Sequence, residues 1–435
     1  MYLIEIICEY SFDDKLLMEY SNGFETLFQK GLEDENTQVK VSAFKTLTVF
    51  LSSITKLELV MKFSSVLNIL LHKSIELIKF DQESGITTLE SLNELIEVHP
   101  KFVKPILNDM LTIYVEIMEA EALLVNLRIT AMHGVFLLAS NHPATVKKTQ
   151  IFKTKYVGVY MKMLSEIHET SVEEWANEFK DEIISKNDIS LSTEEHLSQL
   201  LEVLGNKFML PLFIGQIQEY LKSDQPHLQH AGLTCMSILT ENCHESYKGE
   251  LKNIFGLMLP ILNTTNPRLI VDIVVAMGYM SEEFAPEIQE NYGDLILQFI
   301  CKCLKHNYPK VQFKGALCIQ NFEKGLAEHK DKEIKIMDKY IDQILGSLGT
   351  IFENSLSGMN YIMLEAILDT ISTIAEHNSF DRFYPTFMPG LKKIISMIGI
   401  DTQQKIMIRS KTIETMGYLL YAIRENAALF KPECE

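Results

Sequence analysis

Three stretches that align with one another decide the fold of this chain: SDQPHLQHAGL (residues 223–233), TNPRLIVDIV (265–274) and NYPKVQFKGA (307–316). In each stretch a polar turn leads to a proline, and aliphatic residues follow the proline. The prolines stand at positions 226, 267 and 309, so the pattern returns after 41 and then 42 residues. This part of the chain is therefore built from a repeated unit.

The length of the period indicates which repeat this is. It lies within the roughly 40–47 residues of HEAT and armadillo repeats and outside the roughly 33–34 of ankyrin and tetratricopeptide repeats. In a two-helix unit of this kind, proline suits the first turn of the second helix because its missing N–H costs nothing there. Each unit leaves an apolar face that only the next unit covers. We therefore predict an all-α, superhelical HEAT-repeat α-solenoid.

Weaker copies of the pattern flank these three. Second helices are predicted to begin near residues 37–43, 81–86, 127–131, 361–364 and 404–409. The chain then holds about nine or ten units. We divide it into N-terminal HEAT repeats (1–165), an acidic insert or linker (166–196) and central HEAT repeats (197–435).

Composition agrees with a helical repeat protein. The 435 residues exceed the roughly 250–300 at which a single hydrophobic core stops growing. Hydrophobic residues make up 47%, whereas only 20 glycines and 12 prolines interrupt the chain. The net charge of −18 disfavours nucleic acid and anionic membranes, and it favours basic partners reached by electrostatic steering.

The acidic insert interrupts the period. Between residues 166 and 195 ten acidic residues stand against two lysines, and the segment holds Trp175, the only tryptophan. Two interpretations remain open. The segment is either a solvated loop or helix–loop, or an acidic lip that contacts a basic partner.

Signatures of catalysis are missing from the sequence. It has no phosphate-binding glycine-rich loop, no His-Glu-x-x-His, no Gly-x-Ser-x-Gly and no kinase signature set. The seven cysteines form no disulfide framework, and the spacing of Cys301 and Cys303 does not suit zinc. We interpret Cys301 and Cys303 as helix residues and Cys243 as a core residue. We expect no enzyme activity, no catalytic residue, no cofactor and no metal.

The ends of the chain and its apolar runs carry further expectations. No apolar run approaches the roughly 20 residues of a membrane span, so we expect no membrane insertion. The N-terminus has acidic residues in place of a basic region, which argues against a signal peptide. It also begins without a helix-capping signal, and we expect the chain to be part of a longer protein.

Several strings in residues 197–422 are specific. The most specific are FMPGLK (387–392) and RSKTIE (409–414), preceded by HAGL (230–233) and MGYM (277–280). With these strings the chain resembles the importin-β3, or importin-5-like, type of the importin-β (karyopherin-β) family. Residues 1–165 resemble the family only in outline.

The resemblance implies a monomeric nuclear import receptor that shuttles between cytoplasm and nucleus. Such receptors bind lysine-rich nuclear localisation signals of basic cargo on the concave face of their second helices. Their outer first helices bind Phe-Gly repeats of nucleoporins, and the GTP form of Ran releases the cargo. The major Ran contact belongs to repeats that we expect to lie outside this chain. The alternative is a HEAT-repeat scaffold subunit of a multiprotein assembly.

Acidic residues recur at repeat spacing where such cargo would bind. Glu241, then Glu282 or Glu283, then Glu323 stand near the ends of successive predicted second helices. Asp369, Glu376 and Glu414 continue this ladder, and Asn321 could hold the backbone of a bound peptide. Lys324 departs from the family, in which this position looks acidic. Ordinary solvated surface is the alternative for each acid taken alone.

Overall fold

The computed structural model of the protein describes residues 19, 21–167, 171–177, 188–329, 335–377 and 383–423. Helices and the turns between them make up all of these residues, and no strand occurs among them. The predicted all-α fold is confirmed. Contacts between helices divide the chain into two compact units, Met1–His168 with Ile184–Glu219 and Glu169–Ile183 with Tyr220–Glu435.

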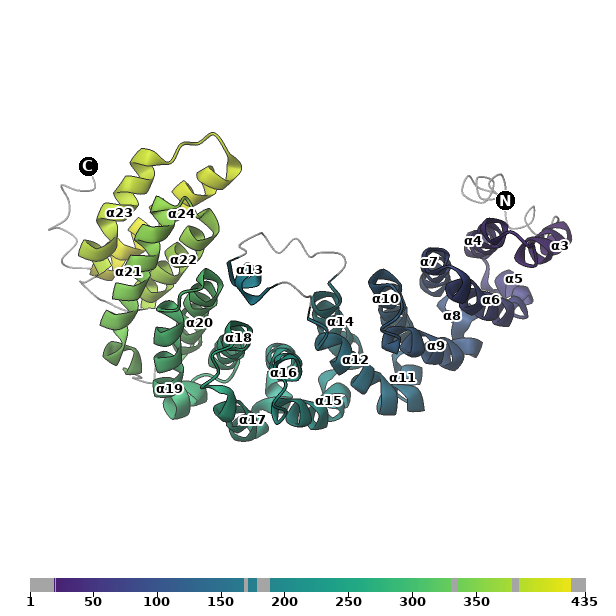
Figure 1. Ribbon diagram of the computed structural model, residues 1–435, viewed down its shortest axis with the longest axis horizontal. Coiled ribbons are helices and arrows are strands. Elements are labelled where there is room, and N and C mark those ends of the chain that lie inside the picture. The colour runs from purple at the N-terminus through teal and green to yellow at the C-terminus, as the bar shows by residue number, and fades with distance from the viewer. Residues whose placement is uncertain are drawn as a thin grey trace. The chain divides into compact units, whose positions relative to one another are not determined.

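Among its described residues, the first unit contains four pairs of helices and a further helix; Figure 1 shows their order along the chain. Several first helices are split into short pieces. The helices are α3 (Ser21–Leu32), α4 (Thr37–Ser53), α5 (Leu57–Val60), η1 (Met61–Phe63), α6 (Val66–Phe80), α7 (Gln82–Val98), α8 (Pro100–Val103), η2 (Lys104–Ile106), α9 (Leu107–Glu119), α10 (Val125–Asn141), α11 (Pro143–Val146), η3 (Phe152–Tyr156), α12 (Val157–Leu164), α14 (Ile189–Leu204) and α15 (Asn206–Leu221).

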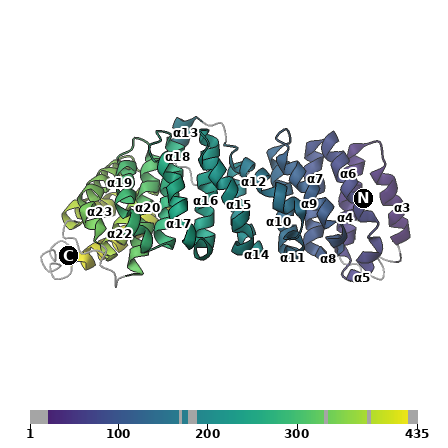
Figure 2. The same cartoon turned by 90° about the horizontal axis from the view of Figure 1, so that it is seen from below.

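The second unit continues the series and includes one short helix from the acidic insert. Its helices are α13 (Val172–Asn177), α16 (Pro226–Tyr247), η4 (Lys248–Glu250), α17 (Leu251–Met258), η5 (Leu259–Ile261), α18 (Pro267–Glu283), α19 (Glu287–Leu304), α20 (Pro309–Ala327), η6 (Ile336–Lys339), α21 (Ile341–Ser357), α22 (Tyr361–His377), α23 (Phe383–Met397) and α24 (Gln403–Ile423). Figure 2 shows the same helices from below.

The second helices of the repeats form a continuous layer in each unit. In the first unit α4, α7, α10 and α14 pack in sequence, and in the second α16, α18, α20, α22 and α24 do the same. First helices pack on one another as well, as α19, α21 and α23 show. This stacking of neighbours on neighbours is the architecture of a helical repeat protein.

The repeat turns form as their sequence predicts. Helices α16, α18 and α20 begin at Pro226, Pro267 and Pro309. The turn before α18 places Asn266 as the N-cap, and its side-chain oxygen accepts a hydrogen bond from the backbone N–H of Arg268 at 3.0 Å. Such a cap satisfies one of the amide groups that a helix leaves free at its start.

Small residues one turn later bring the paired helices together. A Cβ atom on Gly315 of α20 would lie 2.9 Å from the Cβ of Cys303 on α19. Apolar side chains fill the space between layers, among them Ile300, Val311 and Ile319, all fully buried or nearly so. Cys243, Cys301 and Cys303 are buried helix residues, as predicted.

Both ends of the predicted acidic insert (166–196) are joined to the repeats. Glu166 forms a bidentate ion pair with Arg128, in which the two guanidinium nitrogens lie 2.6 and 2.7 Å from the two carboxylate oxygens. Arg128 is only 2% exposed, so Glu166 compensates a buried charge. Residues from Ile189 onward belong to α14. Residues 168–170 and 178–187 lie outside the described part.

Candidate functional site

Each second helix keeps one stripe of side chains out of the core. On α18 the partly exposed residues include Arg268, Asp272, Val275, Tyr279 and Glu282. Their spacing of four, three, four and three residues places them on one face of a helix. The stripe therefore runs the whole length of α18, with a cationic group near its start and a carboxylate near its end.

The stripe of α20 repeats that of α18 after 42 residues. Its members are Lys310, Lys314, Leu317, Asn321 and Lys324, each at least partly exposed. Lys310 thus corresponds to Arg268, Asn321 to Tyr279 and Lys324 to Glu282. The stripes of α18 and α20, together with the equivalent residues of α16, α22 and α24, form one surface. We call this surface the second-helix face.

A carboxylate cluster lies where α16 and α18 adjoin. Glu241, an exposed residue in the last third of α16, accepts a hydrogen bond from the hydroxyl of Tyr279, and the carboxylate of Glu282 is near enough to repel it. Partial burial raises the pKa of Glu241, the Tyr279 bond opposes this, and the charge of Glu282 adds to the rise. An ammonium group placed between these carboxylates would relieve the repulsion. Glu283 lies beside Glu282 and is half-exposed.

The structure does not place Glu323 where the predicted ladder of acids requires it. Glu323 is only 2% exposed, and it occupies the position in α20 that Ser281, fully buried, holds in α18. One residue further along a helix turns the side chain by about 100°. Lys324 therefore takes the surface position, and Glu323 cannot contact a peptide on this face. Asn321 does lie on the stripe, with its Nδ2 atom 3.4 Å from the Cβ position of Gly278 on α18.

The later acids are engaged with a lysine of the chain. The ammonium group of Lys411 lies 2.8 Å from the Asp369 carboxylate and 3.6 Å from that of Glu414. The hydrogen bond to Asp369 is the main reason that the pKa of Lys411 is raised. Glu376 is exposed near the end of α22. A ligand lysine would have to replace Lys411 at Asp369 and Glu414.

Two groups that lie against the predicted acids were not among the residues predicted from the sequence. Tyr279 and Lys411 carried no assigned role, although both stand at helical spacing from predicted site residues. A search for residues three and four positions before each predicted acid would have found Tyr279 next to Glu282 and Glu283, and Lys411 next to Glu414.

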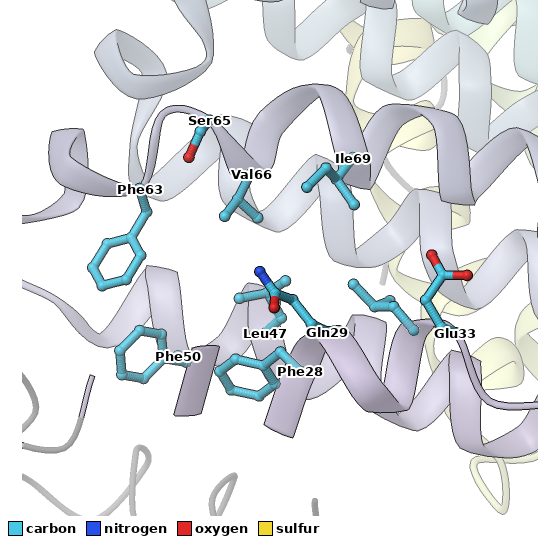
Figure 3. Close-up of a pocket in the computed structure, with 10 residues that line it drawn as sticks. Phe28, Gln29, Glu33, Leu47, Phe50, Phe63, Ser65, Val66 and Ile69 are labelled. Carbon is cyan, nitrogen blue, oxygen red and sulfur yellow. The ribbon is translucent and has the colours of Figure 1, made fainter. Parts of the chain in front are cut away.

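A second candidate site is an apolar pocket in the first unit (Figure 3). Its volume is about 400 Å³. The first helices α3 and α6 form its sides, with η1 and α4 completing it. The residues that line it are Phe28, Gln29, Leu32, Glu33, Leu47, Phe50, Phe63, Ser65, Val66 and Ile69.

Aromatic rings define this pocket. The ring centroids of Phe28 and Phe50 are 5.8 Å apart, and those of Phe50 and Phe63 are 5.5 Å apart in an edge-to-face arrangement. Phe28 and Phe50 are buried, whereas Ile69 at the mouth is 41% exposed. Such a pocket can accept one more apolar or aromatic side chain, since edge and face contacts with the rings are available.

The described residues offer little for other chemistry. Among them no group of three or more His, Cys, Asp or Glu is arranged to hold a metal ion. Burial raises the pKa of the Cys243 thiol to about 11 and that of Cys303 to about 12, which keeps both protonated and unreactive. None of the described helices combines the length and apolar character that a bilayer crossing requires.

Comparison with known proteins relates the chain to importins. Residues 13–113 match the family model described as "IPO5-like, TPR repeats". Importin subunit beta-3 of Saccharomyces cerevisiae is 24% identical over 92% of this chain, and the probable importin-5 homolog of Dictyostelium discoideum is 23% identical over 98%. These matches cover 36% and 39% of the two proteins, so the chain spans less than two fifths of their length.

Solved structures of Kap121p have the same fold. Kap121p bound to Pho4p matches with a TM-score of 0.78 and 22% identity, over 94% of this chain and 39% of that one. Kap121p bound to Nup53p matches with a TM-score of 0.79 and 21% identity, over 99% of this chain and 42% of that one. The chain thus has the HEAT-repeat solenoid fold of Kap121p.

Proposed function

Because this chain is a homologue of importin subunit beta-3 and importin-5 proteins, we propose that it carries the cargo-binding part of a nuclear transport receptor. Proteins of the importin-β family are transport receptors and not enzymes. In this proposal, the second-helix face binds lysine-rich nuclear localisation signals, and the protein shuttles as a monomer between cytoplasm and nucleus. Ran in its GTP form releases the cargo in the whole protein.

The observation that carries the proposal is the cluster of Glu241, Tyr279 and Glu282. The Glu241 carboxylate accepts a hydrogen bond from the Tyr279 hydroxyl and is repelled by the carboxylate of Glu282, and partial burial raises the pKa of Glu241. Negative charge held in partly buried surroundings attracts a cation more strongly than the same charge in bulk water does. An extended peptide with a lysine at this carboxylate cluster would pass Asn321 on the neighbouring helix α20. The side-chain amide of Asn321 can both donate hydrogen bonds to a peptide backbone and accept them from it.

The test is a double charge reversal, Glu241→Lys with Glu282→Lys. We expect the affinity for a labelled lysine-rich signal peptide to fall by more than about tenfold, because like charges then face the ligand. Fluorescence anisotropy gives the affinity, and circular dichroism confirms the helix content.

The matched control is Glu116→Lys with Glu353→Lys. Both residues are exposed on first helices, α9 and α21, and the change in net charge is the same. We expect this control to bind nearly as well as the unchanged chain. If both double variants lose affinity equally, the second-helix face is not the binding site, and a HEAT-repeat scaffold becomes the better interpretation.

We propose further that the pocket of Phe28, Phe50 and Phe63 receives the phenylalanine of a nucleoporin Phe-Gly repeat. The pocket is lined mainly by apolar and aromatic side chains, with Gln29, Glu33 and Ser65 among them, and it lies between two first helices, where the family resemblance implies such contacts. Kap121p, which has the same fold, has been solved bound to Nup53p.

Ile69→Asp tests the pocket. Ile69 is partly exposed at the mouth, so the change adds a charge to the entrance without opening a cavity in the core. We expect binding of a Phe-Gly repeat peptide to fall at least about fivefold. Ile413→Asp, at a 62% exposed isoleucine of α24, is the control and should bind normally. Equal loss in both variants, or loss in neither, would reject the pocket as the binding site.

A further inference from the structure

The short helix α13 of the acidic insert is seated on the second-helix face. Although α13 stands between α12 and α14 in the chain, it contacts α18 and α20 (Figures 1 and 2). Ala176 is fully buried in this contact, whereas Glu173 and Glu174 are exposed. The helix starts in a capping box, since Ser171 Oγ accepts from the Glu174 N–H at 3.1 Å and donates to its carboxylate at 3.0 Å.

Trp175 of α13 lies between two cations of the stripes described above. The guanidinium carbon of Arg268 is 4.9 Å from the centre of the indole ring, and the ammonium nitrogen of Lys310 is 4.5 Å from it. The Lys310 ammonium also lies 3.5 Å from the backbone carbonyl oxygen of Trp175. Both distances to the ring fall within the range of a cation–π contact. We call Arg268 and Lys310 the cation pair.

The position of the cation pair explains why an aromatic ring and acidic residues suit it. Arg268 and Lys310 are each the second residue of their helix, α18 and α20. The N-terminus of a helix carries a partial positive charge, so a cation there adds to a potential that is already positive. The negative face of an indole ring and the carboxylates of an acidic segment are both attracted to such a potential.

The helix α13 depends on this contact for its own order. It has only six residues, and a helix that short is not stable alone in water. It contacts α18 and α20, with Trp175 beside Arg268 and Lys310 and with Ala176 fully buried. A short segment held by one ring between two cations can leave and be replaced by another segment of the same chemistry.

We propose that the cation pair is a docking site for a partner segment in which an aromatic residue follows acidic residues on a short helix. α13 is the resident occupant of this site, and the partner's segment replaces it. The partner segment is acidic and aromatic, which is the opposite of the chemistry of a lysine-rich signal. It uses the start of the α18 and α20 stripes, whereas the carboxylate cluster lies near their end, so the two sites can be tested apart.

The first test uses the peptide of residues 171–177, SVEEWAN, labelled with fluorescein, and the whole chain. Trp175→Ala removes the ring of the resident occupant. We expect the Trp175→Ala chain to bind the peptide at least about tenfold more tightly than the unchanged chain, because a tethered occupant competes at a high effective concentration. Equal binding to the two chains would overturn the proposal.

Two matched changes locate the binding. Lys310→Ala added to Trp175→Ala should abolish the gain in peptide affinity. Lys324→Ala added to Trp175→Ala changes an exposed residue at the far end of the same helix and should leave that gain intact. A peptide with both glutamates changed to glutamine should bind more weakly than SVEEWAN. If Lys310→Ala and Lys324→Ala behave alike, the peptide binds elsewhere and the proposal fails.

The second readout is the emission of Trp175, the only tryptophan of the chain. Arg268→Ala with Lys310→Ala should shift this emission to longer wavelength, because the ring then enters water. A peptide SVEEFAN, which has no tryptophan, should produce the same shift when added in excess to the unchanged chain. An unshifted emission in the double variant would show that the cation pair does not hold the ring. Neither readout involves lysine-rich peptides, so failure here leaves the proposed function untouched.

Discussion

Glu241 illustrates how the surroundings of one residue change the pKa of its carboxyl group. Its carboxylate lies next to that of Glu282 and bonds to the Tyr279 hydroxyl, and partial burial raises its pKa. The charged form is therefore less favourable in the free protein than in water. A bound lysine would reverse this by pairing with the charge. Binding of a basic peptide and loss of a proton from Glu241 are thus expected to be linked.

The linkage gives a pH dependence with a definite sign. Protonation of Glu241 removes the charge with which the proposed lysine-rich ligand would pair, so the affinity should rise with pH through the raised pKa of Glu241 and stay constant above it. Stability of the free protein has the opposite trend, because the folded state holds this proton more tightly than the unfolded state. The contribution of Glu241 to stability is lost as the pH rises from the ordinary pKa of this carboxyl group, near 4.5, to its raised pKa in the folded protein.

Peptide affinities measured between about pH 4.5 and 7 test this dependence. Glu241→Gln should bind the peptide weakly at every pH and show a flatter profile than the unchanged chain. An identical slope in the two proteins would assign the titration to another group.

At the scale of the element, the second helices α18 and α20 approach each other so closely at Gly325 that no side chain fits there. A Cβ atom on Gly325 of α20 would lie 2.2 Å from the backbone oxygen of Ser281 and 2.9 Å from the Cβ of Ala285. Backbone atoms cannot move aside as the end of a flexible side chain can. The glycine thus sets how closely these two helices, and therefore their stripes, approach each other.

Gly325→Ala should accordingly destabilise the protein by about 1–3 kcal/mol, as overpacking does. Gly346 of α21 is the matched control, because a Cβ there meets nothing within 4 Å. Gly346→Ala should stabilise by about 0.5–1 kcal/mol, since alanine loses less backbone entropy in a helix. Urea unfolding followed by circular dichroism measures both. A neutral Gly325→Ala would mean that the two helices can separate at little cost.

At the scale of the whole molecule, the chain is an acidic repeat protein in two compact units. The net charge of −18 is spread over both. Repeat architecture places successive stripes side by side, so an extended ligand can contact several helices at once. Overall charge affects how often a basic ligand arrives, whereas the local carboxylate cluster affects how long it stays.

Salt should separate these two effects. Raising the ionic strength from about 0.05 to 0.5 M shortens the screening length and should slow association of a lysine-rich peptide at least about tenfold, with a smaller change in dissociation. Stopped-flow anisotropy gives both rates. Glu116→Lys with Glu353→Lys should lower the association rate slightly, and Glu241→Lys with Glu282→Lys should mainly raise the dissociation rate. Association independent of salt would contradict a role for the net charge.

The sequence by itself determined the helical repeat. Prolines at 226, 267 and 309 open α16, α18 and α20, and second helices were also expected near where α22 and α24 begin. These features are readable because helix starts and apolar spacing are local properties. The predicted three-part division of the chain stays a prediction, as does Ran binding.

Only the tertiary structure decided which residues of the repeat face outward and what they meet. Glu323 and Lys324 are neighbours in sequence, yet one is core and the other surface, because about 100° of helix rotation separates them. The bond from Tyr279 to Glu241 and the ion pair of Lys411 with Asp369 join residues one repeat apart. Trp175 lies between Arg268 and Lys310 although the sequence separates it widely from both. Spacing along the chain carries no such information, since these contacts depend on how helices stack.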